Sequence, residues 1–235
     1  MITFRNVNMR FKNSAVMENF CEEFVENKIN CILGPSGCGK TTMLNLLSGI
    51  LNEDSGQITK PESISYVFQE EALVPQKTVR KNLELVLKSV YKDKIELKTV
   101  IDKFLKISDL ENAAELYPRE MSGGMRQRLA LIRAFAYPSD ILLMDEPFKA
   151  LDISLRNSLI KSFIDLYEKD KRTVLFVTHD IDEALLTGDF IHVYSNKPLT
   201  LQKKFAVEEK QDTRKLYDDS ITKIKNEIYK ETEKW

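Results

Sequence analysis

Short apolar runs rich in β-branched residues recur along the chain and predict buried strands. The runs are Asn30 to Leu33, Ile64 to Phe68, Ile141 to Asp145, Thr173 to Thr178 and Phe190 to Tyr194. Between several of them, apolar residues follow helical spacing, near 40–49, 152–170 and 180–187. Buried strands that alternate with helices are typical of a parallel sheet, so the pattern predicts an α/β fold with a mainly parallel sheet.

Two stretches depart from that alternation. From about 76 to 136, helical patterns follow one another without a convincing strand, which predicts an α-helical subdomain inserted after Phe68. Beyond Val207 the chain is highly charged, yet four residues keep helical spacing: Tyr217, Ile221, Ile224 and Ile228. We therefore expect an amphipathic helix over about 212–232, whose stripe packs on the body of a single domain spanning residues 1–235.

The composition is that of an ordinary soluble globular protein, because 43% of the 235 residues are hydrophobic and 30% are charged. The formal net charge of −1 argues against a nucleic-acid partner, which would favour a strongly basic surface. Cys21, Cys31 and Cys38 are odd in number and lack metal-ligand spacing, which fits a reducing cytosol. The apolar runs are too short to span a bilayer, so we expect any membrane path to belong to another chain.

A glycine-rich loop follows the run that ends at Leu33 and opens a helix. It consists of Gly34, Pro35, Ser36, Gly37, Cys38, Gly39, Lys40, Thr41 and Thr42. The spacing fits the phosphate-binding loop, in which backbone N–H groups surround phosphates at a helix N-terminus. Lys40 would then reach the β- and γ-phosphates of a nucleotide and Thr41 would bind Mg²⁺. A plain helix-capping turn is the alternative, and the preceding strand and the Lys-Thr pair favour the nucleotide. We also expect the helix N-terminus to make Cys38 a reactive thiolate.

Two carboxylates end the buried run Ile141 to Asp145. Ligands of open α/β sheets bind at such strand ends, so Asp145 is a candidate Mg²⁺ ligand. Glu146 follows directly and is a candidate general base for an attacking water. An ordinary pair of surface acids is the alternative, and the phosphate loop in the same chain favours the functional interpretation.

The segment Met121-Ser-Gly-Gly-Met-Arg-Gln-Arg128 begins another predicted helix, with Ser122 at its N-cap. This segment resembles the signature of ABC transporter ATPases, commonly Leu-Ser-Gly-Gly-Gln. Further matches follow in family order: Phe11 at the adenine-stacking position, Gln69 at the Q-loop, Ala150-Leu151-Asp152 at the D-loop, and His179 at the switch histidine. The resemblance covers essentially residues 1–200.

The resemblance implies a P-loop ABC ATPase core with an antiparallel N-terminal β-subdomain, and a role for each matching residue. Two copies would face head to tail, with the nucleotide-contacting groups of the second copy being Ser122, Gly123, Gly124 and Asp152. Gln69 would join the Mg²⁺ ligands Thr41 and Asp145. His179 would contact the γ-phosphate and orient Glu146. Phe11 would stack on adenine, although aromatic residues near a first hairpin also commonly pack into the core.

Some positions depart from the common family pattern. Met121 and Met125 replace the usual Leu and Gln, and Lys149 stands where a small residue is frequent. Met125 with the following Arg-Gln-Arg resembles the nitrate/sulfonate/taurine and glycine-betaine branches of importer ATPases, and the run Glu71 to Val79 with Asn82 resembles the first of these branches. That branch implies solute import through separate transmembrane permease subunits, with an extracytoplasmic solute-binding protein acting indirectly and the ATPase at the cytoplasmic face of the membrane. A separate-chain exporter ATPase and a non-transport soluble ABC ATPase are the alternatives.

Overall fold

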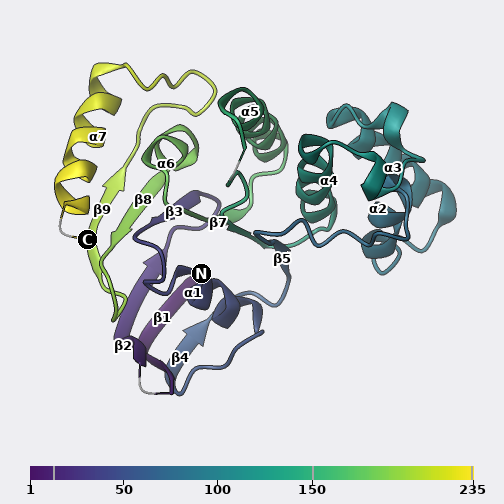
Figure 1. The fold of residues 1–235 in the computed structure, drawn as a ribbon. Helices are drawn as coiled ribbons and strands as arrows, with labels where there is room; N and C mark the ends of the chain where they lie inside the picture. The colour runs from purple at the N-terminus through teal and green to yellow at the C-terminus, as the bar shows by residue number, and fades with distance from the viewer. Residues whose placement is uncertain (13, 150, 234) are drawn as a thin grey trace.

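The computed structural model describes residues 1–12, 14–149, 151–233 and 235, and its largest sheet has six strands in the order β5-β6-β7-β3-β8-β9 (Figure 1). The strands are β3 (Ile29–Leu33), β5 (Ile64–Val67), β6 (Ile141–Asp145), β7 (Thr173–Thr178), β8 (Phe190–Tyr194) and β9 (Leu201–Ala206). All neighbours pair in parallel except β8 and β9, which are antiparallel. The predicted α/β fold with a mainly parallel sheet is confirmed.

A second, antiparallel sheet is built from the N-terminal part of the chain. Its order is β2-β1-β4, with β1 (Ile2–Phe11), β2 (Ser14–Phe24) and β4 (Ser55–Thr59). Helix α1 (Lys40–Ser48) lies between the two sheets, and its buried apolar side chains share one cluster with residues of both. Gly49, in the left-handed conformation at φ 77°, ends this helix. The expected antiparallel N-terminal layer is therefore present.

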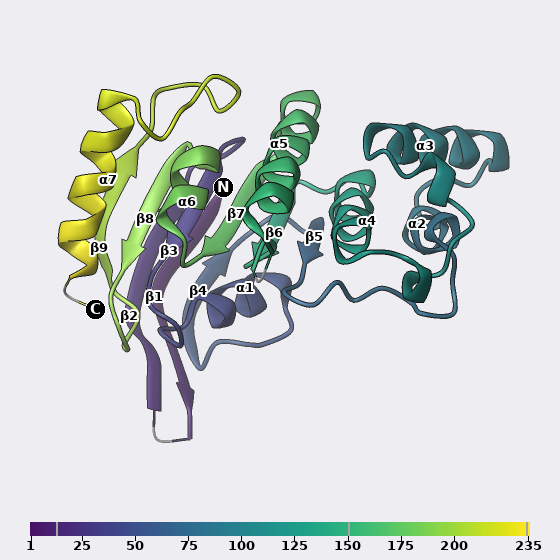
Figure 2. The same cartoon turned by 45° about the horizontal axis from the view of Figure 1, so that its top comes forward.

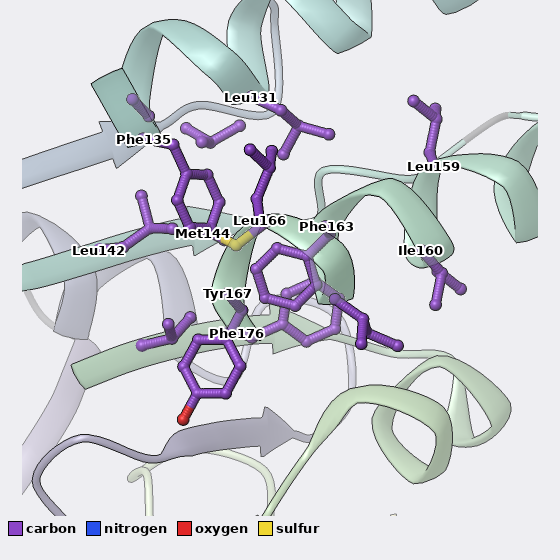
Figure 3. Close-up of a cluster of buried hydrophobic side chains, with 14 of the residues drawn as sticks. Leu131, Phe135, Leu142, Met144, Leu159, Ile160, Phe163, Leu166, Tyr167 and Phe176 are labelled. Atoms are coloured by element: carbon purple, nitrogen blue, oxygen red, sulfur yellow. The ribbon is translucent and has the colours of Figure 1, made fainter. Parts of the chain in front are cut away.

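The opposite face of the large sheet is covered by α5 (Ile153–Lys169), α6 (Ile181–Thr187) and α7 (Asp219–Thr232). Alternate residues of the strands point to this side because side chains alternate across a strand. Figure 3 shows Phe163 of α5 against Phe176 of β7, with ring centroids 6.2 Å apart. This aromatic contact fixes α5 on the strand that precedes His179.

The segment between β5 and β6 contains helices and no strand among the described residues. The elements are α2 (Val79–Leu87), α3 (Lys94–Ile107), the short 3₁₀ turns η1 (Glu111–Ala113) and η2 (Pro118–Glu120), and α4 (Gly123–Ala136). Both views show α2 and α3 at the end of the molecule away from α7, with α4 between them and α5 (Figure 2). The boundaries of a separate helical subdomain stay a prediction.

Helix α7 differs from its predicted extent. It begins at Asp219 rather than near 212, and Tyr217 is 76% exposed instead of joining the buried stripe. Arg214 explains the difference, because its guanidinium donates to backbone oxygens of Leu185 and Gly188 at the end of α6 and holds the preceding segment outside a helix. Ile221 and Ile228 are fully buried as expected. Within the part of the chain that the structure describes, no helix has the length and apolar character of a membrane span.

Candidate active site

The glycine-rich loop joins the end of β3 to α1 and takes a conformation that only glycine adopts readily. Gly37 and Gly39 have φ of 78° and 122°, and a Cβ on Gly39 would lie 2.6 Å from Val16 Cγ1. The ammonium of Lys40 is turned into the loop, where it donates to the backbone oxygens of Gly34 at 2.7 Å and Pro35 at 2.8 Å. Only 5% of Lys40 is exposed, so its buried charge is stabilised by these carbonyl groups.

This loop forms one wall of a cavity of about 350 Å³. The cavity is lined by Phe11, Val16, Ser36, Gly37, Gly39, Lys40, Thr41, Thr42, Gln69, Glu146, Lys149 and Lys197. The lining thus brings together residues predicted to bind phosphate, to stack on adenine, to form the Q-loop and to act as general base. They meet in this cavity although they come from distant parts of the sequence. Phe11 is 44% exposed at this cavity, so the core-packing alternative for its side chain is wrong.

Asp145 lies at the carboxyl end of β6 and is 4% exposed. Burial raises the pKa of Asp145 above its ordinary value and outweighs the opposing effect of the hydrogen bond with Thr41. Among the described residues, its Oδ1 is buried without a hydrogen-bond partner. An orphaned carboxylate oxygen beside a threonine hydroxyl suits a hard cation such as Mg²⁺, so these residues fit the predicted metal.

Glu146 follows in the left-handed region at φ 45°, held there by its N–H, which donates to Val177 O at 2.9 Å. Its two carboxylate oxygens have different partners. His179 Nδ1 lies 3.4 Å from Oε1, and Lys149 Nζ lies 2.7 Å from Oε2. Burial acts to raise the pKa of Glu146, but the contact with Lys149 and the neighbouring His179 outweigh it, so this pKa lies below its ordinary value.

The predicted signature and D-loop residues lie outside the lining of this cavity. Ser122 caps α4 by accepting from Met125 N, and Asp152 caps α5 by accepting from Leu155 N at 2.9 Å. A Cβ on Gly124 would lie 2.5 Å from Leu155 Cδ1, so close packing of α4 on α5 already requires this glycine. Ala150 of the predicted D-loop lies outside the described residues. The roles of these residues toward a nucleotide remain predictions.

Cys38 contradicts the expectation of a reactive thiolate. Its side chain turns away from the cavity into the core beneath the loop, where Cys38 is 1% exposed. Its Sγ packs closely on Gly34, because a Cβ added to Gly34 would lie only 3.2 Å from this sulfur. Burial raises the pKa of this thiol and outweighs the opposing effect of Lys40. Desolvation therefore dominates over the helix N-terminus, and the thiol is not the activated group that the motif predicted.

Three residues of the cavity were missed by sequence reasoning: Val16, Lys149 and Lys197. Val16 and Lys197 belong to no motif, and only the pairing of the sheets brings them to the loop. Lys149 did carry a signal, because it replaces a residue that is frequently small. The replacement marked position 149 as unusual, but it did not predict that Lys149 contacts Glu146.

A family model described as ABC transporter matches residues 18–149. The formylaminopyrimidine import ATP-binding protein ThiZ of Halalkalibacterium halodurans is 38% identical over 85% of this chain and 81% of its own length. The aliphatic sulfonates import ATP-binding protein SsuB of Bacillus cereus is 38% identical over 80% of this chain and 77% of its own length. The dimeric structure of a bacterial ABC transporter cassette superposes with a TM-score of 0.77 at 29% identity, covering 89% of this chain and all of that one. The chain therefore belongs to the ATP-binding proteins of ABC transporters, a family of ATP hydrolases.

Proposed function

We propose that this chain hydrolyses Mg-ATP in the cavity beside the glycine-rich loop and thereby drives solute import through separate permease subunits. The observation that carries the proposal is the meeting of Lys40, Gln69 and Glu146 in one cavity of about 350 Å³. These residues would supply a phosphate-binding cation, a polar amide and a general base, and phosphoryl transfer to water uses groups that hold the phosphates and position the water.

The chemistry follows from where these groups lie. Loop N–H groups and Lys40 would hold the β- and γ-phosphates, while Phe11 at the exposed side of the cavity would stack on the adenine ring. Glu146 would take a proton from the attacking water, and His179, 3.4 Å from its Oε1, would orient that carboxylate and contact the γ-phosphate. Mg²⁺, held by Thr41, Gln69 and Asp145, would neutralise charge on the phosphates.

A second copy of the chain would complete the site. Ser122 and Gly123 lie exposed at the N-terminus of α4 and outside their own cavity, so they are available to a γ-phosphate held by a facing copy, whereas Gly124 is buried against α5. Gly123 has open space around its Cα, since the nearest atom to an added Cβ would be 3.8 Å away on Arg126. Solved relatives include a dimeric post-hydrolysis cassette bound to ADP and Pi, at 28% identity and a TM-score of 0.76.

Import is favoured over export by the relatives, two of which are named as import proteins for formylaminopyrimidine and aliphatic sulfonates. Phe68 and Leu85 expose apolar surface in a groove of about 390 Å³ between β5, α2 and α4, where a permease helix would dock. We therefore place the chain at the cytoplasmic face of the membrane, in a transporter of the nitrate/sulfonate/taurine type that receives its solute from an extracytoplasmic binding protein.

Uptake in cells that lack this gene tests the proposal. We expect uptake of labelled taurine, an alkanesulfonate or nitrate to fall, and the wild-type gene to restore it while E146Q does not, because a glutamine cannot accept the proton from water. Increased retention of a labelled solute in the deletion cells would instead indicate export. Restoration of uptake by E146Q to the wild-type level would contradict the role of Glu146.

A further inference from the structure

Lys149 belongs to the candidate site although none of the family motifs includes it. Its Nζ lies 2.7 Å from Oε2 of Glu146, the oxygen opposite the one that faces His179. Both Lys149 and Glu146 line the cavity. The side chain of Lys149 is 44% exposed and that of Glu146 is 11% exposed, so the cation is the partner with freedom to move.

The contact between them is an ion pair whose lysine is partly exposed to solvent. Among the residues that the structure describes, Oε2 of Glu146 has no hydrogen bond of good geometry and Lys149 is its ion-pair partner. Lys40, by contrast, is 5% exposed and already bonded to two backbone carbonyl groups. Lys149 is therefore an adaptable cation at the same cavity, next to the position proposed for the reacting phosphate.

We propose that Lys149 is a second phosphate-contacting lysine, which neutralises Glu146 before ATP binds and passes to the γ-phosphate when ATP enters. A terminal phosphate carries more negative charge than a carboxylate and offers three oxygens, so it competes well for one exposed ammonium. The exchange would leave Oε2 of Glu146 free to face the attacking water. This inference rests on the proposed ATP hydrolysis in this cavity.

The fold of the turn does not depend on the Lys149 side chain. Lys149 N donates to Glu146 O at 3.2 Å, and Phe148 is buried against Phe176 with ring centroids 5.8 Å apart. Glu146 N is held by Val177 O. Backbone bonds and an aromatic contact therefore fix the turn, and a neutral side chain of similar length at position 149 should leave it folded.

The test is made in an E146Q background, where ATP is not consumed during titration calorimetry with Mg²⁺. We expect K149M to weaken ATP binding about tenfold or more, the usual effect of losing a hydrogen bond to a charged group, and to change ADP binding less than twofold because ADP lacks the γ-phosphate. K149R keeps the charge and should retain ATP affinity. K171M is the matched control. Lys171 Nζ lies 3.2 Å from a carboxylate oxygen of Glu168, with the same spacing of three residues, and this pair lies outside the cavity.

Two results would overturn the inference. Unchanged ATP affinity in K149M would show that Lys149 does not reach the γ-phosphate, and equal losses for ATP and ADP would show a general effect on the cavity. The melting temperature of each variant shows whether a loss of affinity comes from misfolding, because a folded variant keeps the melting temperature of the E146Q protein. Failure of the proposed function has a different signature, because the wild-type protein would then not hydrolyse ATP, or E146Q would hydrolyse it at the wild-type rate.

Discussion

Asp145 and Glu146 are neighbours in the chain, yet their surroundings favour different chemistry. Asp145 is enclosed at the end of β6 with an orphaned oxygen, and burial raises its pKa. Glu146 meets Lys149 and His179, which hold its pKa below the ordinary value despite burial. Asp145 is thus suited to binding a cation at the end of its strand, and Glu146 is suited to a reaction at the cavity surface.

The three cysteines give a prediction at the residue scale. A maleimide should label Cys21 first, because it is exposed, while Cys38 and Cys31 react slowly because both are buried. Burial raises the pKa of Cys31 to about 12 and raises that of Cys38 as well, so neither thiol is ionised appreciably at neutral pH. Mass spectrometry of peptides over a time course measures this order. Labelling of Cys38 as fast as Cys21 would mean that the loop opens readily.

The motif spacing predicted which residues would form the phosphate loop, because a loop of this kind is contiguous in sequence. It could not predict the direction of each side chain within it. Cys38 packs beneath the loop, and Lys149 reaches back to Glu146, because tertiary contacts set both orientations. Position within a motif therefore indicates proximity to the site, and only the packing shows which way a side chain points.

At the scale of elements, strands with a continuous apolar run were predictable, and strands without such a run were not. The five apolar runs correspond to β3, β5, β6, β7 and β8. Four of these lie inside the sheet, where strands covered on both faces need apolar side chains throughout, while β5 lies at the sheet edge and is only partly buried. Strands β4 and β9 also lie at sheet edges, and polar residues break up their apolar pattern. In β9 these include Lys203 and Lys204, and such lysines protect an edge from pairing with other chains. Their sequences lack the apolar signal on which the prediction relied.

Helix α7 provides a prediction at this scale. Ile228 is fully buried, so I228A should lower the free energy of unfolding by about 2–5 kcal/mol through lost burial and the cavity left behind. Y217A is the control, because Tyr217 is 76% exposed and precedes the helix, and it should change this free energy by about 0.5 kcal/mol or less. Urea unfolding measures both. Equal losses in the two variants would show that the segment before α7 is packed as the helical spacing predicted.

The whole molecule positions the site through the order of its strands. The glycine-rich loop follows β3, Glu146 follows β6 and His179 follows β7, and these three strands are adjacent in the order β6-β7-β3. Their carboxyl ends therefore lie together at one edge of the sheet, where ligands of such sheets bind. The sequence predicted parallel strands, but strand order depends on crossover connections that a single sequence pattern does not specify.

Ser122 and Asp152 cap the N-termini of α4 and α5. Within one copy they face no part of the cavity lining. In the proposed head-to-tail pair, these residues would contact the nucleotide of the other copy, and ATP would bridge the two molecules. The γ-phosphate would then be the group that distinguishes the closed pair from separate copies.

The molar mass of E146Q by light scattering after size-exclusion chromatography tests this account most directly. Loss of the general base should slow hydrolysis about 10²–10⁴-fold, so ATP persists and E146Q should shift from monomer to dimer with Mg-ATP but not with Mg-ADP. Adding S122R should abolish the shift by placing bulk against the phosphate, whereas adding S122A, which removes only the cap, should retain it. An ATP-loaded E146Q protein that stays monomeric at high concentration would contradict the paired site, as would an E146Q protein that hydrolyses ATP at the wild-type rate.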